Sequence, residues 1–98
     1  MGRSGINITP MLMGTWQAGK SMWAGIDDAE TLKSIRIAFD LGMNVFDTAA
    51  TYGDGYSEQI LGKALSDVRS DAIIATKVFF TQLKYEQVIE SCHQSLIN

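Results

Sequence analysis

Short apolar runs alternate along this chain with segments in which apolar residues recur at helical spacing. The apolar runs occupy residues 11–13, 44–49 and 72–76, and a segment with helical spacing follows each of them. This alternation is typical of strand-helix units that build a parallel sheet. Near the amino terminus, Ile6 and Ile8 alternate with polar neighbours, which indicates a short leading strand or β-hairpin. The pattern therefore predicts an α/β fold with three buried strands.

Caps and spacing predict three helices. Asp27 and Glu30 form a plausible capping box ahead of a helix at about residues 28–41. Gly42 then stands where the carboxyl end of a helix favours left-handed backbone. Ser57 has the side chain of a good amino cap for a second helix. A third helix carries an apolar stripe at i, i+3, i+4, i+7 and i+11, made of Tyr85, Val88, Ile89, Cys92 and Leu96.

Composition narrows the classes of function. With 98 residues, 46% of them apolar, the chain suits one small globular domain. Its 11 acidic and 8 basic residues give a net charge of −3 without any basic cluster, which argues against a nucleic-acid or anionic-membrane partner. Cys92 is the only cysteine, so no intrachain disulfide can form, and a cytoplasmic location is expected. No apolar run approaches the ~20 residues of a membrane helix.

Three polar residues lie at or just beyond the ends of the predicted strands. Asp47 lies in the second apolar run, Tyr52 follows that run, and Lys77 directly follows the third. Parallel strands carry their carboxyl ends to one edge of a sheet, so a carboxylate, a phenol and an amine would gather there. This combination suggests proton-transfer chemistry. A simpler interpretation stays open, in which Asp47 and Lys77 end strands in water and Tyr52 flanks an Asp54-Gly55 turn.

Other distinctive side chains favour structural roles when each is taken alone. Trp16 and Trp23 could pack in the core or in a loop rather than form a substrate wall. His93 borders the apolar stripe of the third helix, where a solvated or half-buried role is expected, and Cys92 lies within the stripe as a core residue. Adjacent on one helix, these two side chains point in different directions and lack partners, so no metal site is predicted.

Residues 53–58 invite comparison with a dinucleotide-binding loop. Their sequence, Gly-Asp-Gly-Tyr-Ser-Glu, follows a predicted strand and precedes a predicted helix, the placement of G-x-G-x-x-G. Glu58 stands at the third glycine position, and a carboxylate there would repel a pyrophosphate group. We therefore reject a Rossmann phosphate loop. Glu58 is better interpreted as favouring the amino terminus of its own helix.

Longer motifs in this chain resemble the aldo-keto reductase family. These motifs are Gly14-Thr15-Trp16, residues 46–58 (FDTAATYGDGYSE), residues 60–65 (ILGKAL) and Ala75-Thr76-Lys77. The resemblance implies a (β/α)8 TIM barrel, of which the chain would form the first three strand-helix units with parallel strands in the order 1-2-3. It also implies NADPH as cofactor, with NADH as the alternative, and reversible reduction of an aldehyde or ketone to an alcohol. The stretch with Trp23 and Gly25-Ile26-Asp27 is similar to a bacterial-type branch.

The resemblance assigns roles to individual residues. The catalytic residues would be Asp47, Tyr52 and Lys77, with Tyr52 as the proton donor. The family's fourth catalytic residue, a histidine at the end of the next strand, has no counterpart, and His93 does not replace it. The cofactor-binding residues would be Gly14, Thr15, Trp16 and Asp47. The pocket for a small carbonyl substrate would be lined by Trp16, Trp23 and Tyr52.

The expected catalytic trio has a physical rationale. Hydride delivery to a carbonyl carbon leaves negative charge on the oxygen, and a nearby hydroxyl must supply a proton as that charge develops. A cation within about 4–6 Å favours the ionised form of a phenol and so makes it a better proton donor. Lys77 would supply that cation to Tyr52, and Asp47 would hold the amine in place.

Length limits what the 98 residues can do alone. A complete barrel needs about 250 residues, so residues 1–98 are expected to be the amino-terminal part of one barrel domain and to be inactive in isolation. Exposed sheet edges would favour self-association. Two alternatives stay open: a non-catalytic reductase-like fragment that works by association, and a small flavodoxin-like α/β binding module. Strand order and helix placement separate the barrel from the second alternative.

Overall fold

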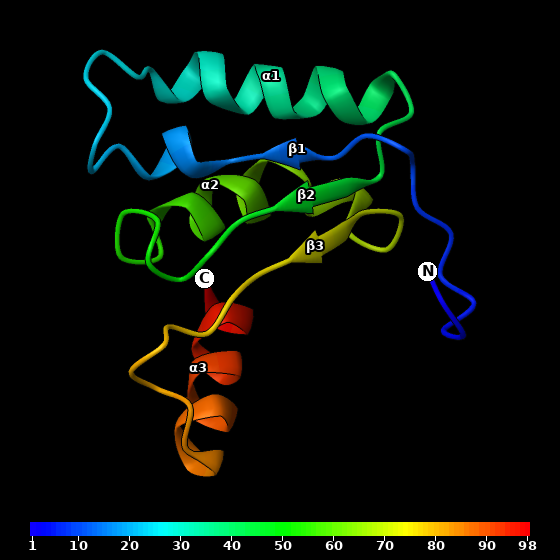
Figure 1. The fold of residues 1–98 in the computed structure, drawn as a ribbon. Helices are drawn as coiled ribbons and strands as arrows, with labels where there is room; N and C mark the ends of the chain where they lie inside the picture. The colour runs from blue at the N-terminus through cyan, green and yellow to red at the C-terminus, as the bar shows by residue number, and fades with distance from the viewer.

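The computed structural model describes residues 1–98 and contains three strand-helix units (Figure 1). The strands are β1 (Met13–Gly14), β2 (Val45–Asp47) and β3 (Ile73–Ala75). The helices are α1 (Asp28–Asp40), α2 (Tyr56–Ala64) and α3 (Tyr85–Ile97), with short 3-10 helices η1 (Trp16–Gly19) and η2 (Ser66–Val68). None of the helices combines the length and the apolar character needed to span a membrane.

The three strands form one parallel sheet in the order β1-β2-β3. Phe46 in the middle of β2 pairs with Met13 on one side and with Ile74 on the other. Consecutive strands are therefore neighbours. Each connection runs from the carboxyl end of one strand back to the amino end of the next. The predicted strand order is confirmed.

The core lies between the sheet and the first two helices. Phe46 of β2, Ile35 of α1 and Leu61 of α2 belong to one cluster, and all three side chains are fully buried. Burial of a side chain of this size contributes roughly 1.5–3 kcal/mol. Because α1 and α2 both pack around the same strand residue, they cover one face of the sheet, as helices cover the outside of a barrel. A doubly wound sheet would have helices on both faces.

The helix ends show which capping predictions hold. The Asp27 carboxylate accepts a 2.9 Å hydrogen bond from the Glu30 N–H, so Asp27 caps α1 as predicted, but the Glu30 side chain does not complete the capping box. Gly42, just beyond α1, has the expected left-handed backbone with a φ of +97°. Helix α2 forms where it was predicted, but Ser57 is not its amino cap, because Gly55 caps the helix, with a φ of +85°, and Ser57 is its second residue. The Ser57 hydroxyl has buried partners instead.

The amino-terminal segment differs from the prediction. Residues 1–12 contain no strand, so the leading hairpin is not formed. The first strand begins only at Met13, and Met11 and Leu12, expected within it, are exposed. An isolated pair of short strands is marginally stable in water, which explains why alternating isoleucines alone do not produce a hairpin.

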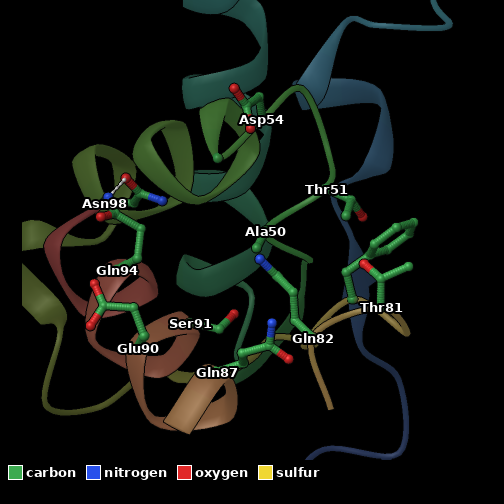
Figure 2. A pocket seen from close by; sticks show the side chains of 12 residues that line it. Ala50, Thr51, Asp54, Thr81, Gln82, Gln87, Glu90, Ser91, Gln94 and Asn98 are labelled. Carbon is green, nitrogen blue, oxygen red and sulfur yellow. Dashed lines mark hydrogen bonds between the residues drawn. The ribbon is translucent and has the colours of Figure 1, made fainter. Parts of the chain in front are cut away.

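Helix α3 forms at the predicted place, but its apolar stripe is exposed. Tyr85 and Leu96 are 77% and 74% exposed, and Cys92, expected in the core, is also exposed. The carboxyl end of the helix lies beside α2, where Asn98 donates to Glu58, and its amino end points away from α1 and α2 (Figure 1). A polar cleft of about 640 Å³ separates it from the loop after β2, with Thr51 and Gln82 among its lining residues (Figure 2). Helical spacing thus predicted the stripe but could not identify a surface to cover it.

Candidate active site

The carboxyl edge of the sheet brings together the loops that follow all three strands. Gly14, Asp47 and Ala75 pair across the last row of the sheet. Backbone hydrogen bonds continue beyond that row, since the Thr15 N–H donates to the Asp47 carbonyl at 2.9 Å. In the same way, the Thr48 N–H donates to the Ala75 carbonyl at 2.8 Å. The residues that follow the strands therefore share one rim, as the sequence predicted.

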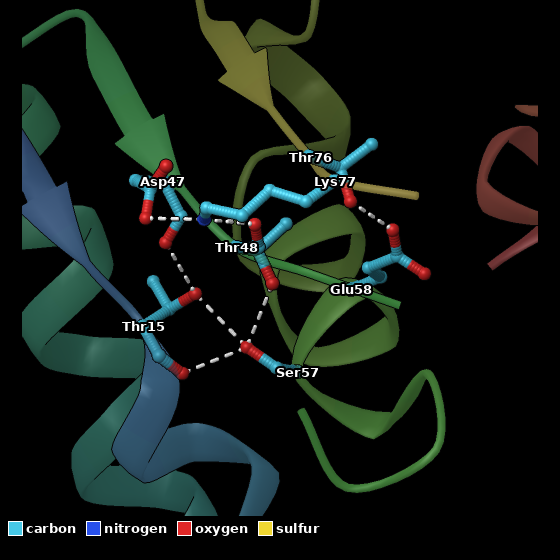
Figure 3. Close-up of polar contacts among 7 residues, drawn as sticks. All are labelled: Thr15, Asp47, Thr48, Ser57, Glu58, Thr76 and Lys77. Carbon is cyan, nitrogen blue, oxygen red and sulfur yellow. Dashed lines mark hydrogen bonds and ion pairs between the residues drawn. The ribbon is translucent and has the colours of Figure 1, made fainter. Parts of the chain in front are cut away.

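Lys77 and Asp47 form an ion pair on this rim. Lys77 Nζ donates to Asp47 Oδ2 at 2.7 Å and to the Thr48 carbonyl oxygen at 2.8 Å (Figure 3). Partial burial lowers the pKa of Lys77, but the hydrogen bond and charge of Asp47, with a smaller contribution from Tyr52, outweigh burial and raise the pKa above its ordinary 10.5. The amine is therefore a cation at neutral pH.

Tyr52 lies beside this amine. Lys77 Nζ is 5.2 Å from the centroid of the Tyr52 ring, within the range of a cation–π contact. The Trp16 ring lies 6.2 Å from the Tyr52 ring, and Trp23 packs edge-on against Trp16 at 5.7 Å. Trp16 and Trp23 are 43% and 40% exposed, so they are not core residues. The structure thus brings together Asp47, Tyr52, Lys77 and both tryptophans.

The loop that carries Tyr52 is held by a close backbone contact with η1. A Cβ atom on Gly19 would lie 2.5 Å from the carbonyl carbon of Tyr52. A Cβ atom on Gly53, whose φ is +67°, would overlap the carbonyl oxygen of Gly19. Both positions therefore require glycine, because any larger residue would push the two segments apart. This contact fixes Tyr52 relative to the loop after β1.

A buried hydroxyl network lies beneath the rim (Figure 3). Ser57 Oγ donates to the Thr15 carbonyl at 2.7 Å and accepts from Thr48 Oγ1 at 3.0 Å. Thr15 Oγ1 lies 2.9 Å from Ser57 Oγ and donates to the Asp47 carbonyl at 3.0 Å. Buried hydroxyls are costly unless they are paired, and each of these is paired. The network joins the ends of β1 and β2 to the first turn of α2.

Glu58 has a tertiary role in addition to its place near a helix start. Its side chain is buried, with Oε1 accepting from Thr76 Oγ1 at 2.6 Å and Oε2 accepting from Asn98 Nδ2 at 2.9 Å. It remains in the first turn of α2, as predicted. Its carboxylate, however, connects that turn to the residue before Lys77 and to the end of α3.

A second polar cluster holds the loop that carries the tryptophans. Lys20, between Trp16 and Trp23, places its Nζ 2.8 Å from Asp28 Oδ1. The Tyr56 hydroxyl donates to Asp28 Oδ2 at 2.5 Å. The close ion pair with Lys20 holds the pKa of the Asp28 carboxyl below its ordinary value. The loop is thereby tied to the first residues of both α1 and α2.

The rim geometry and the strand order agree with a comparison to known families. The aldo/keto reductase family model matches residues 10–98. This chain belongs to the aldo/keto reductase family.

Individual reductases share both sequence and fold with the chain. Aldo-keto reductase YhdN of Bacillus subtilis is 35% identical over an alignment of 103 positions, which covers 95% of this chain and 31% of that protein. The thermostable aldo-keto reductase Tm1743, solved with the inhibitor epalrestat, superposes with a TM-score of 0.87 at 32% identity and covers 99% of this chain and 36% of its own. An aldo-keto reductase from Klebsiella pneumoniae in complex with NADPH gives a TM-score of 0.79 at 28% identity. This match covers 90% of this chain and 30% of the Klebsiella chain.

These reductases confirm the predicted fold class. The chain folds as three consecutive strand-helix units of a (β/α)8 barrel, with parallel strands in sequential order. The flavodoxin-like alternative is wrong, because α1 and α2 share one face of the sheet. The chain spans about a third of the length of the reductases it matches.

Several residues of the candidate site could not be assigned from the sequence. Ser57, Glu58 and Gly19 support the rim, yet a serine near a helix start, an acid in a first turn and a loop glycine each have commoner explanations. His93 is exposed on α3. Thr15 lies at the expected place, but its side chain is buried in the hydroxyl network.

Proposed function

We propose that residues 1–98 are the amino-terminal part of a reductase barrel that converts an aldehyde or ketone into an alcohol, with NADPH as cofactor and NADH as the alternative. Membership of the aldo/keto reductase family supports an oxidoreductase. The observation that carries the proposal is the placement of Lys77 Nζ, 2.7 Å from Asp47 Oδ2 and 5.2 Å from the centre of the Tyr52 ring. A carboxylate, an amine and a phenol are thus in contact at the end of the strands.

Each side chain has a defined part in this proposal. A reduced nicotinamide, when bound, supplies the hydride for the carbonyl carbon. The Tyr52 hydroxyl gives its proton to the carbonyl oxygen as negative charge develops there. The proton loss leaves a phenolate, which the Lys77 cation stabilises. Asp47 keeps the amine charged and in place, so the cation stays beside Tyr52.

The rim fits one end of a nicotinamide nucleotide. Asp47 Oδ2 is bonded to Lys77, whereas Oδ1 accepts no hydrogen bond from the protein and is available to a hydroxyl donor. Gly14 has open space where a Cβ would lie, so a ligand can approach its backbone. Trp16 presents a half-exposed ring next to Tyr52. Thr15 would contribute only through its backbone, because its side chain is buried. The solved Klebsiella relative, which is in complex with NADPH, supports a nicotinamide cofactor.

The start of α2 does not provide the phosphate site. A Cβ on Gly55 would lie 2.6 Å from Asn98 Nδ2, so the Asn98 side chain already covers the approach to that residue. The nearby Glu58 carboxylate adds negative charge. We therefore expect the phosphates to depend on residues outside this chain, and the 98 residues alone to lack saturable NADPH binding and turnover.

Carbonyl-dependent oxidation of NADPH tests the proposal in a protein that carries this sequence within a complete barrel. Lys77→Met should reduce turnover strongly, because the phenolate loses its cation. Lys33→Met is the matched control, since Lys33 is exposed and makes no ion pair. Equal turnover in the two variants would contradict the proposal.

A second candidate function, association with another chain, is favoured by the exposed apolar stripe of α3. Tyr85 and Leu96 of the stripe, and the neighbouring Ile97, are each more than 70% exposed. Exposed apolar surface of this kind marks interaction sites. Sedimentation of the 98-residue chain, together with an NADPH titration of the complete barrel, separates the two functions. Self-association without any catalytic activity of the complete barrel would favour the second.

A further inference from the structure

We propose that Glu58 is a positioning residue, which acts through Thr76 to fix the backbone that presents the Lys77 amine to Asp47 and Tyr52. An effect of Glu58 on catalysis presupposes the proposed reductase function. The contact itself is a property of this chain and is testable without activity. Nothing in the proton-transfer scheme requires Glu58 to touch the substrate.

The environment of Glu58 calls for an explanation. Its side chain is only 6% exposed, yet no lysine or arginine pairs with it. A buried carboxylate without a cation is costly unless its oxygens accept hydrogen bonds. Both oxygens do so, from the Thr76 hydroxyl and the Asn98 amide. An exposed acid would serve the amino terminus of α2 equally well, so burial points to a role for these particular bonds.

The bond to Thr76 acts on the site through one peptide unit. Thr76 lies between Ala75, the last residue of β3, and Lys77. Its hydroxyl donates to the carboxylate at 2.6 Å, the short distance of a charge-assisted hydrogen bond. With the Thr76 side chain held, the chain cannot rotate freely where it leaves the sheet. The direction in which Lys77 departs is therefore set by α2.

The neighbouring residue in α2 fixes the other end of the lysine. Ser57 accepts from the Thr48 hydroxyl at 3.0 Å, and the Thr48 carbonyl in turn accepts from Lys77 Nζ at 2.8 Å. Figure 3 shows Ser57 and Glu58 reaching toward Thr48 and Thr76 respectively. Two consecutive residues of α2 thus act on the two ends of Lys77. Glu58 holds the backbone before Lys77, and Ser57 holds Thr48, whose carbonyl accepts the hydrogen bond from the amine.

The pKa of Lys77 in the 98-residue chain tests this inference. It is measured by a pH titration in which NMR detects lysine labelled with carbon-13 at Cε. The ionisable groups that face the amine are Asp47 from β2 and Tyr52 from the following loop. Thr76→Val removes the hydroxyl but leaves the Glu58 charge. It should lower the pKa of Lys77 toward the ordinary 10.5, because the amine is then held less firmly on Asp47. Thr81→Val, an exposed position in the next loop, should leave the titration unchanged.

Variants at both ends of the bond separate positioning from direct electrostatics. Glu58→Gln removes the charge but keeps an acceptor for Thr76, and Thr76→Ser keeps the donor, so both should titrate like the unmodified chain. Glu58→Ala breaks the bond from the helix side and should match Thr76→Val, which keeps the test decisive if Thr76→Val does not fold. A pKa of Lys77 that is unchanged in Thr76→Val or Glu58→Ala, or equally lowered in Glu58→Gln, would overturn the inference.

The complete barrel supplies a second readout. Thr76→Val should lower kcat on the order of 10–100-fold with little change in KM, and Thr76→Ser should restore it. The rate of reduction should fall at alkaline pH as Lys77 loses its proton. In Thr76→Val this fall should occur at lower pH, because the pKa of Lys77 is lower. If the complete barrel has no reductase activity, the proposed function fails while the titration of Lys77 still decides the role of Glu58.

Discussion

Lys77 and Asp47 are 30 residues apart in the sequence, and their side chains meet at 2.7 Å. Both leave the carboxyl edge of neighbouring parallel strands, so the sheet itself determines how close they come. Tyr52, in contrast, stands on a loop. Its place beside the amine depends on the contact of that loop with Gly19 and on the first turn of α2.

Gly53→Ala should destabilise the chain more than Gly25→Ala. Both positions have left-handed backbone, with φ of +67° and +75°, so each alanine costs about 1 kcal/mol in conformational strain. Only the Cβ at Gly53 meets another segment, the carbonyl of Gly19, and that overlap should add roughly 1–3 kcal/mol. Urea unfolding measures both changes in free energy. Equal losses would show that the two segments are not packed as described.

Ser57→Ala should cost about 1–3 kcal/mol, because it leaves the buried Thr48 hydroxyl without its acceptor. Ser70→Ala is the control, since Ser70 is exposed and its hydroxyl makes no hydrogen bond, and its effect should stay within about 0.5 kcal/mol. Denaturant unfolding of both variants gives the comparison. A loss for Ser57→Ala as small as that for Ser70→Ala would mean that the hydroxyl network does not stabilise the rim.

Acid should loosen the loop that carries Trp16 and Trp23. The close ion pair with Lys20 holds the pKa of Asp28 below its ordinary 3.8. A carboxyl whose pKa is lower in the folded state stabilises that state above the unfolded pKa, and this contribution is lost as pH falls through the folded pKa. Fluorescence of the two tryptophans, the only ones in the chain, should therefore change below about pH 4. Asp28→Asn should lack this transition, and an identical acid transition in that variant would rule out the Asp28 contact as its cause.

Particular residues show how far the sequence determines the fold. Asp27 and Gly42 predicted the ends of α1 correctly, because caps and left-handed turns depend on local chemistry. Asp47 and Lys77 were expected on one rim, because parallel strands leave a sheet at the same edge. These predictions needed only the local pattern and one rule of topology.

Other residues show where the same reasoning stops. Ser57 has a side chain that suits a helix cap and a buried network equally, and only tertiary structure decides between them. Cys92 lies in an apolar stripe, but periodicity cannot show whether another surface covers that stripe. The buried partners of Glu58 are 18 and 40 residues away, beyond any local pattern. The catalytic roles of Asp47, Tyr52 and Lys77 remain predictions.

Turnover of Tyr52→Phe in a complete barrel that carries this sequence tests the central claim most directly. Phenylalanine keeps the ring beside Lys77 and Trp16 but removes the hydroxyl that would donate the proton. Carbonyl reduction should be nearly abolished, while NADPH binding, measured by fluorescence titration, should be largely unchanged. Turnover within a few fold of the unmodified protein would contradict Tyr52 as the proton donor.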